Sequence, residues 1–298
     1  MSNEIKRATG LLVIEAVNSN PNGDPDKESD PRQRPNGFGE ISPVSFKRKL
    51  RDLLEDAEGA FLEELTEKCK ARQFEFKPDN FHILESRGRD RKSIAAEMGD
   101  VKNFDQEKFN KSTFVLKYWD ARVFGNTFLE KEAAKGFIKT GVAQFAVGIS
   151  LSPINIIRHT NTNKSGVQEG KNQGMAPLAY RIVEHGVYCM PFFVNPNYAH
   201  KTGCTMQDIE LLKILIPYAY DLTKSAIRPD VRLRHAWFIE HKNSLGSCPD
   251  YLLFEALSPK RKDAVKDAST SWNDYDDVNE LPDNLKNKIE SCVDLVGQ

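Results

Sequence analysis

The stretch Ala8-Thr9-Gly10-Leu11-Leu12-Val13-Ile14-Glu15-Ala16-Val17 decides the fold. It is a short apolar run, rich in β-branched residues, and turn-forming residues end it. A run of this length and composition is typical of a strand that is buried on both faces. Residues 18–39 follow with four prolines, three glycines and few apolar side chains, so we expect a loop there.

A basic amphipathic helix is predicted after this loop. Ser42 can cap it, and Pro43 suits the first helical position. Apolar side chains then recur at the spacing of one helical face: Phe46, Leu50, Leu53 and Ala57. Residues 32–51 also hold six basic side chains against one acid. The predicted helix therefore has an apolar face next to a basic one.

The rest of the chain alternates between charged and strand-like segments. Residues 60–112 are densely and evenly charged, and we expect a peripheral helical insertion with a basic tip, outside the core. Apolar or alternating patterns predict extended segments at 113–124, 142–151, 179–194 and 231–240. Thr205 caps a second predicted helix over 205–223, which Pro217 should kink or shorten. Residues beyond 262 are acidic and weakly patterned.

The order of these elements indicates the fold class. Strand, helix, strand-like pair, helix and strand follow one another, with insertions at two places. Among compact α+β folds, the split βαβ or ferredoxin-like arrangement fits this order best. The second interruption is the long polar segment 158–174, between two strand-like regions. Loops of that length inside a domain are usually functional or disordered.

Composition limits the class of protein. A length of 298 residues allows one core with large insertions or two domains. The net charge of -1 excludes a globally polycationic nucleic-acid coat but allows opposed patches, since residues 263–298 carry nine acids against three lysines. Five widely spaced cysteines contain no CxxC pair. Without a signal-peptide pattern or a membrane-length apolar run, we expect a cytoplasmic protein without membrane contact.

The amide-rich loop has two interpretations besides a plain turn. Asn18, Asn20, Asn22 and Gly23 imitate the start of an EF-hand calcium loop, but Ser29 stands where that loop needs a bidentate glutamate. Calcium binding is therefore disfavoured, and we predict no metal site. The more specific functional hypothesis is that amides and backbone N–H groups bind phosphate or ribose oxygens.

The basic helix likewise allows two interpretations. Its charges can pair internally, Arg48 with Asp52 and Arg51 with Glu55, as on a solvated helix. Lys47 lacks such a partner. The alternative is that the helix binds a row of RNA phosphates, because Arg32, Arg34 and the amide loop are expected in the same region.

Motifs of other functional classes are absent or incomplete. Lys135-Gly136-Phe137-Ile138 begins like an RNP1 signature and then fails, so aromatic stacking on a sheet face is unsupported. His159, His235 and His241 show no spacing that would bring a general base next to its partners, and structural roles are favoured. HExxH, P-loop and GxSxG motifs are missing. We therefore predict no catalytic residue and no cofactor.

Three segments together resemble a known family. They are the amide run Asn18 to Asp26, the helix Phe46 to Asp52, and Tyr118-Trp119-Asp120-Ala121-Arg122-Val123-Phe124-Gly125. Together they look like the repeated backbone subunit of type I CRISPR surveillance (Cascade) complexes, which belongs to the RAMP superfamily. The resemblance is greatest to the type I-C branch of these complexes. The resemblance runs from about residue 8 to 245.

The resemblance implies a fold and an assembly. Members have a modified RRM-like palm, here 1–59 and 113–298, a helical finger insertion, here 60–112, and a protruding thumb hairpin or loop, here 155–178. Copies polymerise along a CRISPR RNA into a helical filament and grip its backbone without reading sequence. The guide then pairs with target DNA. Other Cascade subunits, including the RNA-processing and the large subunit, are implied partners.

Site residues follow from the same resemblance. The implied RNA contacts lie in the amide loop, the basic helix and the thumb: Asn18, Asn20, Asn22, Arg32, Arg34, Lys47, Lys49, Arg51, Arg158, His159, Lys164 and Lys171. Val167 or Met175 is the implied wedge that displaces a base. A missing aromatic platform is consistent with this role, because stacking would bury bases that must pair.

Two other functions stay open at this stage. The same superfamily includes the endoribonuclease that matures CRISPR RNA, and a monomeric single-strand RNA binder is the third hypothesis. Related type III subunits cleave target RNA with a loop aspartate and a divalent metal; Asp24 and Asp26 are the nearest candidates here. We expect no nuclease activity.

Overall fold

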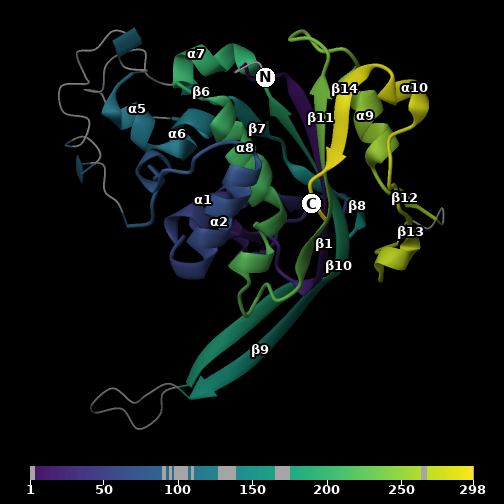
Figure 1. Ribbon diagram of the computed structural model, residues 1–298. Coiled ribbons are helices and arrows are strands. Elements are labelled where there is room, and N and C mark those ends of the chain that lie inside the picture. Colours follow the sequence, from purple (N-terminus) through teal and green to yellow (C-terminus); the bar gives the residue numbers. More distant parts are fainter. Residues whose placement is uncertain are drawn as a thin grey trace, which may run out of the picture.

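The computed structural model describes residues 4–88, 92–93, 96, 107–108, 111–126, 139–164, 175–262 and 267–297. Its centre is an antiparallel sheet (Figure 1). The strands follow one another across the sheet in this order: β14 (Ile289–Asp294), β11 (Val231–His241), β1 (Ala8–Ser19), β10 (Met175–Val194), β8 (Gly148–Pro153) and β4 (Phe38–Ile41). β7 (Ala143–Phe145) and β9 (Ile156–Lys164) also pair with β10.

The ferredoxin-like prediction is confirmed by the connections within this sheet. The chain runs from β1 through helix α1 (Pro43–Glu55) to β8 and β10, then through helix α8 (Met206–Leu215) to β11. β11, β1, β10 and β8 lie side by side and pair antiparallel. This is the strand order of the split βαβ fold. The pair of strands expected between the two helices consists of β8 and β10.

β1 is buried on both faces, as its continuous apolar sequence predicts. Leu12 and Ile14 belong to the core shared with α1, α8 and helix α2 (Gly59–Ala71). Leu11 and Val13 point to the other face, into a second cluster with helices α9 (Asp250–Leu257) and α10 (Asp283–Lys286). Figure 1 shows α1, α2 and α8 on one side of the sheet and α9 and α10 on the other.

The predicted start of α1 is confirmed. Ser42 Oγ accepts a hydrogen bond from the Ser45 N–H, and Pro43 occupies the first turn. Phe46, Leu50 and Leu53 are buried. α8 likewise begins at a capping box between Thr205 and Asp208 and ends before Pro217, which lies in a 3₁₀ turn.

The prediction of a strand at residues 113–124 is wrong. This segment forms two short helices, α5 (Thr113–Lys117) and α6 (Trp119–Phe124), and Ser112 caps the first of them. The apolar residues recur four apart as well as side by side, and the β-branched and aromatic content hid the helical period. The strand predicted at 142–151 is interrupted, since β7 and β8 pair separately with β10.

The charged segment 60–112 is not wholly peripheral. Leu65 and Cys69 of α2, and Phe74, Phe76 and Phe81 after it, are buried in the main core. Because charged side chains stand between these positions, the average hydropathy of the segment does not reveal its buried apolar residues. Much of the predicted basic tip, including Arg89 and Arg91, lies outside the described residues.

The polar segment after Asn155 is partly strand. β9 pairs with the distal half of β10, from Ile156 opposite Val183 to Lys164 opposite Met175. This hairpin projects from the body of the molecule (Figure 1), as the predicted protruding hairpin requires. Lys171 and Val167 lie outside the described residues, and only the backbone of Lys164 and Met175 is described.

The acidic tail has more structure than its sequence pattern suggests, because β14 extends the main sheet beside β11. His235 of β11 binds two carboxylates of this tail. Its Nδ1 lies 2.7 Å from Asp294 Oδ2, and its Nε2 lies 2.8 Å from Asp277 Oδ1. Burial opposes the charged ring, but the two carboxylates outweigh it and raise the pKa of His235 above 6.5.

His235 should therefore make stability depend on pH. Because its folded pKa is raised, its contribution is complete below pH 6.5 and is lost as pH rises through the folded value. We expect the stability advantage of wild type over His235→Gln to fall as pH rises from 6 to 9. Urea unfolding of both proteins at each pH measures this difference. A constant difference across the range would contradict the ion-pair account.

No helix of the described part of the chain combines the length and the apolar character needed to cross a membrane.

Candidate nucleic-acid interface

The amide loop connects the end of β1 to the start of α1. Asn22 Oδ1 accepts a hydrogen bond from the Ser42 N–H at 2.7 Å, and Asn22 Nδ2 donates to Gly23 O at 3.0 Å. Asn20 is buried, and its Nδ2 donates to Ser29 O at 2.9 Å. Asn18 is exposed, with a left-handed φ of 43°. Asn20 and Asn22 thus hold the loop together, and only Asn18 offers its whole amide to solvent.

This loop does not gather metal ligands. Asp24 accepts from the Asp26 N–H and lies 3.8 Å from Arg32, while Asp26 is exposed. Among the described residues, no group of three histidine, cysteine, aspartate or glutamate side chains could hold an ion.

The three basic side chains expected to contact RNA from α1 differ in environment. Lys47 is half-buried with its Nζ 5.3 Å from the centre of the Phe124 ring, and burial lowers its pKa. Within the described parts of the chain it forms no ion pair. Lys49 is buried beside Tyr220. Lys47 is therefore the most available cation of the three.

The side chain of Arg51 does not face solvent, although the family resemblance implies an RNA contact there. Its side chain is buried, its Nε donates to Asp120 Oδ2 at 2.8 Å, and its Nη2 lies 3.0 Å from Glu85. Arg51 therefore pairs with Asp120 and Glu85 instead of the predicted partner Glu55. Arg48 pairs with Asp52, as predicted. Arg51 connects α1 to α6, which favours a structural role.

Acidic residues of the amide loop hold the base of the hairpin. Arg158 of β9 and Arg181 of β10 face each other in the register, and Asp30 accepts hydrogen bonds from both, at 2.5 and 3.1 Å. Arg181 also pairs with Glu28. Glu28 and Ser29 take left-handed φ values of 49° and 67° to present these carboxylates. Asp30 and Glu28 together neutralise the two opposed cations, and Asp30 fixes the loop against the hairpin.

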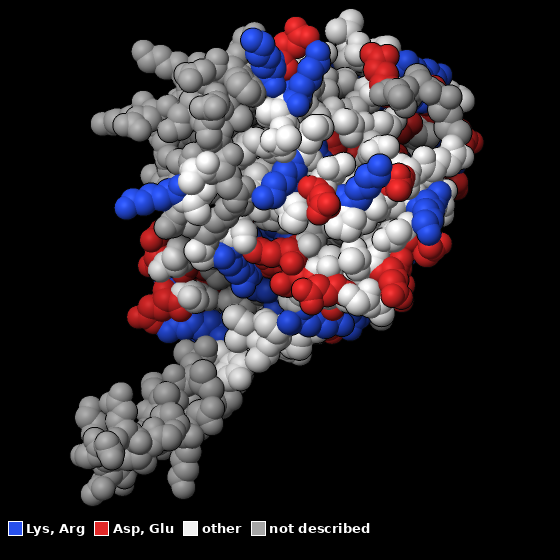
Figure 2. Space-filling view, turned by 60° about the vertical axis from the view of Figure 1, so that its left-hand side comes forward, with Lys and Arg blue, Asp and Glu red and all other residues white. Residues whose placement is uncertain are grey.

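The remaining predicted contacts are dispersed around this region. Arg34 pairs with Glu40 at 2.5 Å, and Arg32 has Asp24 nearby. His159 is exposed on β9, opposite Tyr180. In Figure 2 basic and acidic side chains are interspersed over the face shown, without one large patch of a single sign. On this face the charge is arranged in local clusters, not in a broad basic surface.

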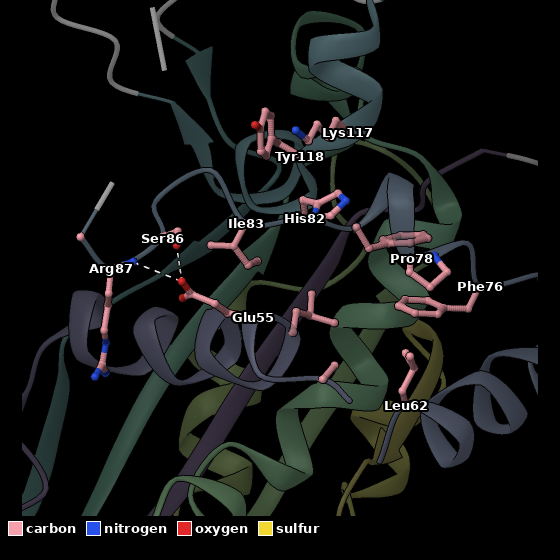
Figure 3. A pocket seen from close by; sticks show the side chains of 14 residues that line it. Glu55, Leu62, Phe76, Pro78, His82, Ile83, Ser86, Arg87, Lys117 and Tyr118 are labelled. Atoms are coloured by element: carbon pink, nitrogen blue, oxygen red, sulfur yellow. Dashed lines mark hydrogen bonds between the residues drawn. The ribbon is translucent and has the colours of Figure 1, made fainter. Parts of the chain in front are cut away.

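A different kind of cavity lies at the other end of α1. It has a volume of about 500 Å³ and is bounded by α1, α2 and the segment 76–88. Figure 3 shows Leu62, Phe76 and Pro78 along its apolar side, and Glu55 accepting hydrogen bonds from Ser86 and from the Arg87 N–H at its polar rim. Apolar side chains contribute much of its lining, so it suits polyanions less well than the region around Lys47.

Comparison with known proteins identifies the family. A model described as "CRISPR-associated protein Cas7" matches residues 6–280. The chain belongs to the Cas7 family. The resemblance seen in the sequence is therefore confirmed at the level of the family.

A curated relative supports this assignment. The CRISPR-associated protein Cas7 of Haloferax volcanii is 27% identical over 236 residues, covering 71% of this chain. The match covers 63% of that relative, so the chain spans less than two thirds of its length.

Solved structures of low sequence identity are also similar. Two are chains of structures described as a CRISPR RNA-guided surveillance complex; the one called pre-nicking has 13% identity, a TM-score of 0.37 and covers 76% of this chain and 77% of its own. The other has 14% identity, a TM-score of 0.38 and coverages of 76% and 68%. A chain of the type III-B Cmr-beta complex bound to cognate target RNA has 10% identity, a TM-score of 0.41 and coverages of 79% and 61%.

Two arginines of this Cas7 family member lie at the interface but were not predicted from the sequence. Arg181 contributes to the hairpin base, and Arg228 donates from its Nε to Asn20 O at 3.1 Å, next to the amide loop. Both are distant in sequence from the residues that they touch. Only the pairing of β10 with β9, and the return of the chain into β11, bring them to this surface.

Proposed function

We propose that this chain binds CRISPR RNA through its phosphate backbone, without reading sequence, as a repeating subunit of a type I surveillance complex related to type I-C. The family match over residues 6–280 carries this proposal. Lys47, without a carboxylate partner in the described structure, lies on the helix that the amide loop leads into. Phosphate is the ligand that such a cation and nearby backbone N–H groups suit.

Burial of the second sheet face supports backbone binding. In an RRM, RNA stacks on the open face of the sheet. Here α9 and the C-terminal segment cover that face, and Leu11, Val13 and Trp237 are buried beneath them. RNA must then lie along the end of the sheet, where α1, the amide loop and the hairpin base meet.

The rest of the proposal concerns assembly. The hairpin would fold over the RNA, with Val167 or Met175 displacing a base and Arg158, His159, Lys164 and Lys171 as polar contacts. Copies of the chain would repeat along the guide as a helical filament beside the RNA-processing and large subunits, in the cytoplasm. The exposed guide bases would then pair with target DNA.

We propose that the subunit does not cut RNA. His235 and His241 are buried and hydrogen-bonded to Asp294, Asp277 and Thr9, far from the arrangement that a general base on a ribose hydroxyl needs. RNA cleavage in magnesium that is lost on Asp24→Ala or Asp26→Ala would overturn this part. Processing of a hairpin-containing precursor in EDTA would favour the endoribonuclease alternative.

The binding itself is tested by charge reversal at Lys47. We expect Lys47→Glu to weaken binding of single-stranded RNA by about tenfold at moderate salt, equally for unrelated sequences, because a phosphate contact carries no sequence information. Lys70→Glu makes the same change in charge on the exposed side of α2 and should bind as wild type. Fluorescence anisotropy measures both.

Equal binding by Lys47→Glu and wild type would contradict the placement on α1. Size-exclusion chromatography with and without RNA separates the proposal from a monomeric binder, since only a repeating subunit grows with RNA length.

A further inference from the structure

Two cations, Lys49 and Arg228, lie at the junction of β1, α1 and the segment before β11. Lys49 is 4% exposed; its Nζ lies 3.4 Å from Thr223 Oγ1 and 5.2 Å from the centre of the Tyr220 ring. Arg228 is close enough to disfavour the charged form of Lys49. Neither forms an ion pair with a carboxylate among the residues that the structure describes. A buried ammonium beside a guanidinium is costly unless an anion compensates it.

A buried hydroxyl at this junction, that of Tyr220, has no hydrogen-bond partner among the described residues. Asn20 receives the Arg228 Nε–H on its backbone oxygen, which fixes the guanidinium beside the amide loop. A phenol, an ammonium and a guanidinium are all donors, and a phosphate group has the acceptors to match them.

The cluster contacts an exposed segment. Lys49 Nζ donates to Thr223 of the segment 221–227, and Leu222 and Ile227 of that segment are 55% and 38% exposed. Arg228 is half-buried at its end. An anion can therefore meet Arg228 at the surface, with Lys49 as a second charge beneath it.

We propose that Lys49, Arg228 and Tyr220 form a second subsite for an RNA phosphate. Binding of RNA there would be accompanied by uptake of a proton on Lys49. The inference rests on the proposed RNA-binding function. It adds a binding residue, Arg228, from outside the predicted loop and helix.

The proton uptake follows from the surroundings of Lys49. Burial, then the charge of Arg228, lower its pKa from 10.5 to about 7; Arg87 acts in the same direction and Asp52 opposes them. Tyr220 and Thr223 face it as neutral groups. A bound phosphate would raise the pKa again, so binding of RNA to the free protein needs a proton at pH values above about 7.

Anisotropy titrations of a labelled single-stranded RNA between pH 6.5 and 8.5 test the subsite. Wild-type affinity should fall by roughly tenfold across this range, because at most one proton is taken up. Lys49→Arg keeps the charge at every pH and should bind RNA with little pH dependence. Circular dichroism and thermal melting establish that each variant is folded.

Replacement of Arg228 tests the second cation. Arg228→Gln should weaken binding about tenfold and reduce the slope of log affinity against log salt by about one. Arg228→Lys should restore most of the affinity. The matched control is Lys224→Gln, an exposed lysine of the same loop that pairs with Asp221, which should stay within about twofold of wild type.

The outcomes distinguish this inference from the proposed function. If Arg228→Gln binds as wild type and Lys49→Arg keeps the wild-type pH dependence, while Lys47→Glu still weakens binding, the subsite is wrong and the backbone-binding function stands. If wild type itself does not bind RNA, both are overturned.

Discussion

Replacing Arg122 with methionine is expected to lower the free energy of unfolding by about 3–5 kcal/mol, because it leaves the buried Asp208 carboxylate without its counter-ion. Arg122 and Asp208 are 4% and 1% exposed, with Nη2 2.7 Å from Oδ1 and Nε 3.0 Å from Oδ2. Arg122 also donates to the backbone oxygens of Val115, Leu116 and Asn80. These carbonyls would lose their donors as well.

A double-mutant cycle separates the energy of the ion pair from that of the other hydrogen bonds of Arg122. Arg122→Met with Asp208→Leu should recover part of the loss, since no uncompensated charge then remains buried. Recovery is incomplete because Asp208 also caps α8 with Thr205. Lys70→Met removes an exposed pair on α2 and should cost less than about 1 kcal/mol. Urea unfolding measures wild type, Arg122→Met, Asp208→Leu, the double variant and Lys70→Met; a loss below about 1 kcal/mol for Arg122→Met would refute the account.

Replacing Lys49 with methionine is expected to have the opposite effect, a gain in stability of about 1–3 kcal/mol at pH 7 without RNA. Lowering the pKa of a buried lysine from 10.5 to about 7 costs the folded state roughly 5 kcal/mol when the side chain is charged in the unfolded chain. Methionine avoids this cost, and some of the gain is lost with the contact to the Tyr220 ring.

The pH dependence identifies the cause of that gain. Because the folded pKa is depressed, the unfolded chain binds more protons, so wild-type stability rises with pH between about 7 and 10.5. The advantage of Lys49→Met over wild type should shrink across this window. The His235 contribution has the opposite sign but is common to both proteins and cancels in the difference. An advantage that does not change with pH would mean that packing, not charge, is responsible.

Together with the proposed subsite, this prediction describes a trade-off. Lys49→Met should be more stable than wild type and bind RNA less tightly. Stability given up at a binding site is a common feature of proteins, because a site that awaits a ligand holds unpaired groups.

The motif Tyr118 to Gly125, which contributed to the family resemblance, has a structural explanation. Asp120 accepts from Arg51 of α1 and from the Leu84 and Glu85 N–H groups. Arg122 holds Asp208 of α8, and Trp119 Nε1 donates to the Asp208 backbone oxygen. The motif therefore connects both helices of the split βαβ core to the inserted segment. Its recognition from sequence was correct, although its predicted strand was not.

Local sequence determined the elements with strong periodic or capping signals. The apolar run of β1, the Ser42–Pro43 start of α1, the Thr205 cap of α8 and the strand β11 all appear where their patterns predict them. Each depends on residues within a few positions of one another, so a local pattern is enough to predict them.

Only the tertiary structure decided which partners these charges find. In sequence, Arg51 is expected to pair with Glu55, and Lys47 has no partner at helical spacing. In the fold, Arg51 meets Asp120, Lys49 donates to Thr223, and Lys47 forms no ion pair with a residue that the structure describes. Whether such a cation is paired can depend on a distant partner, as for Arg51, whose partner Asp120 is 69 residues away in the chain. Electrostatic environment is set by burial and by these long-range neighbours, which no local pattern encodes.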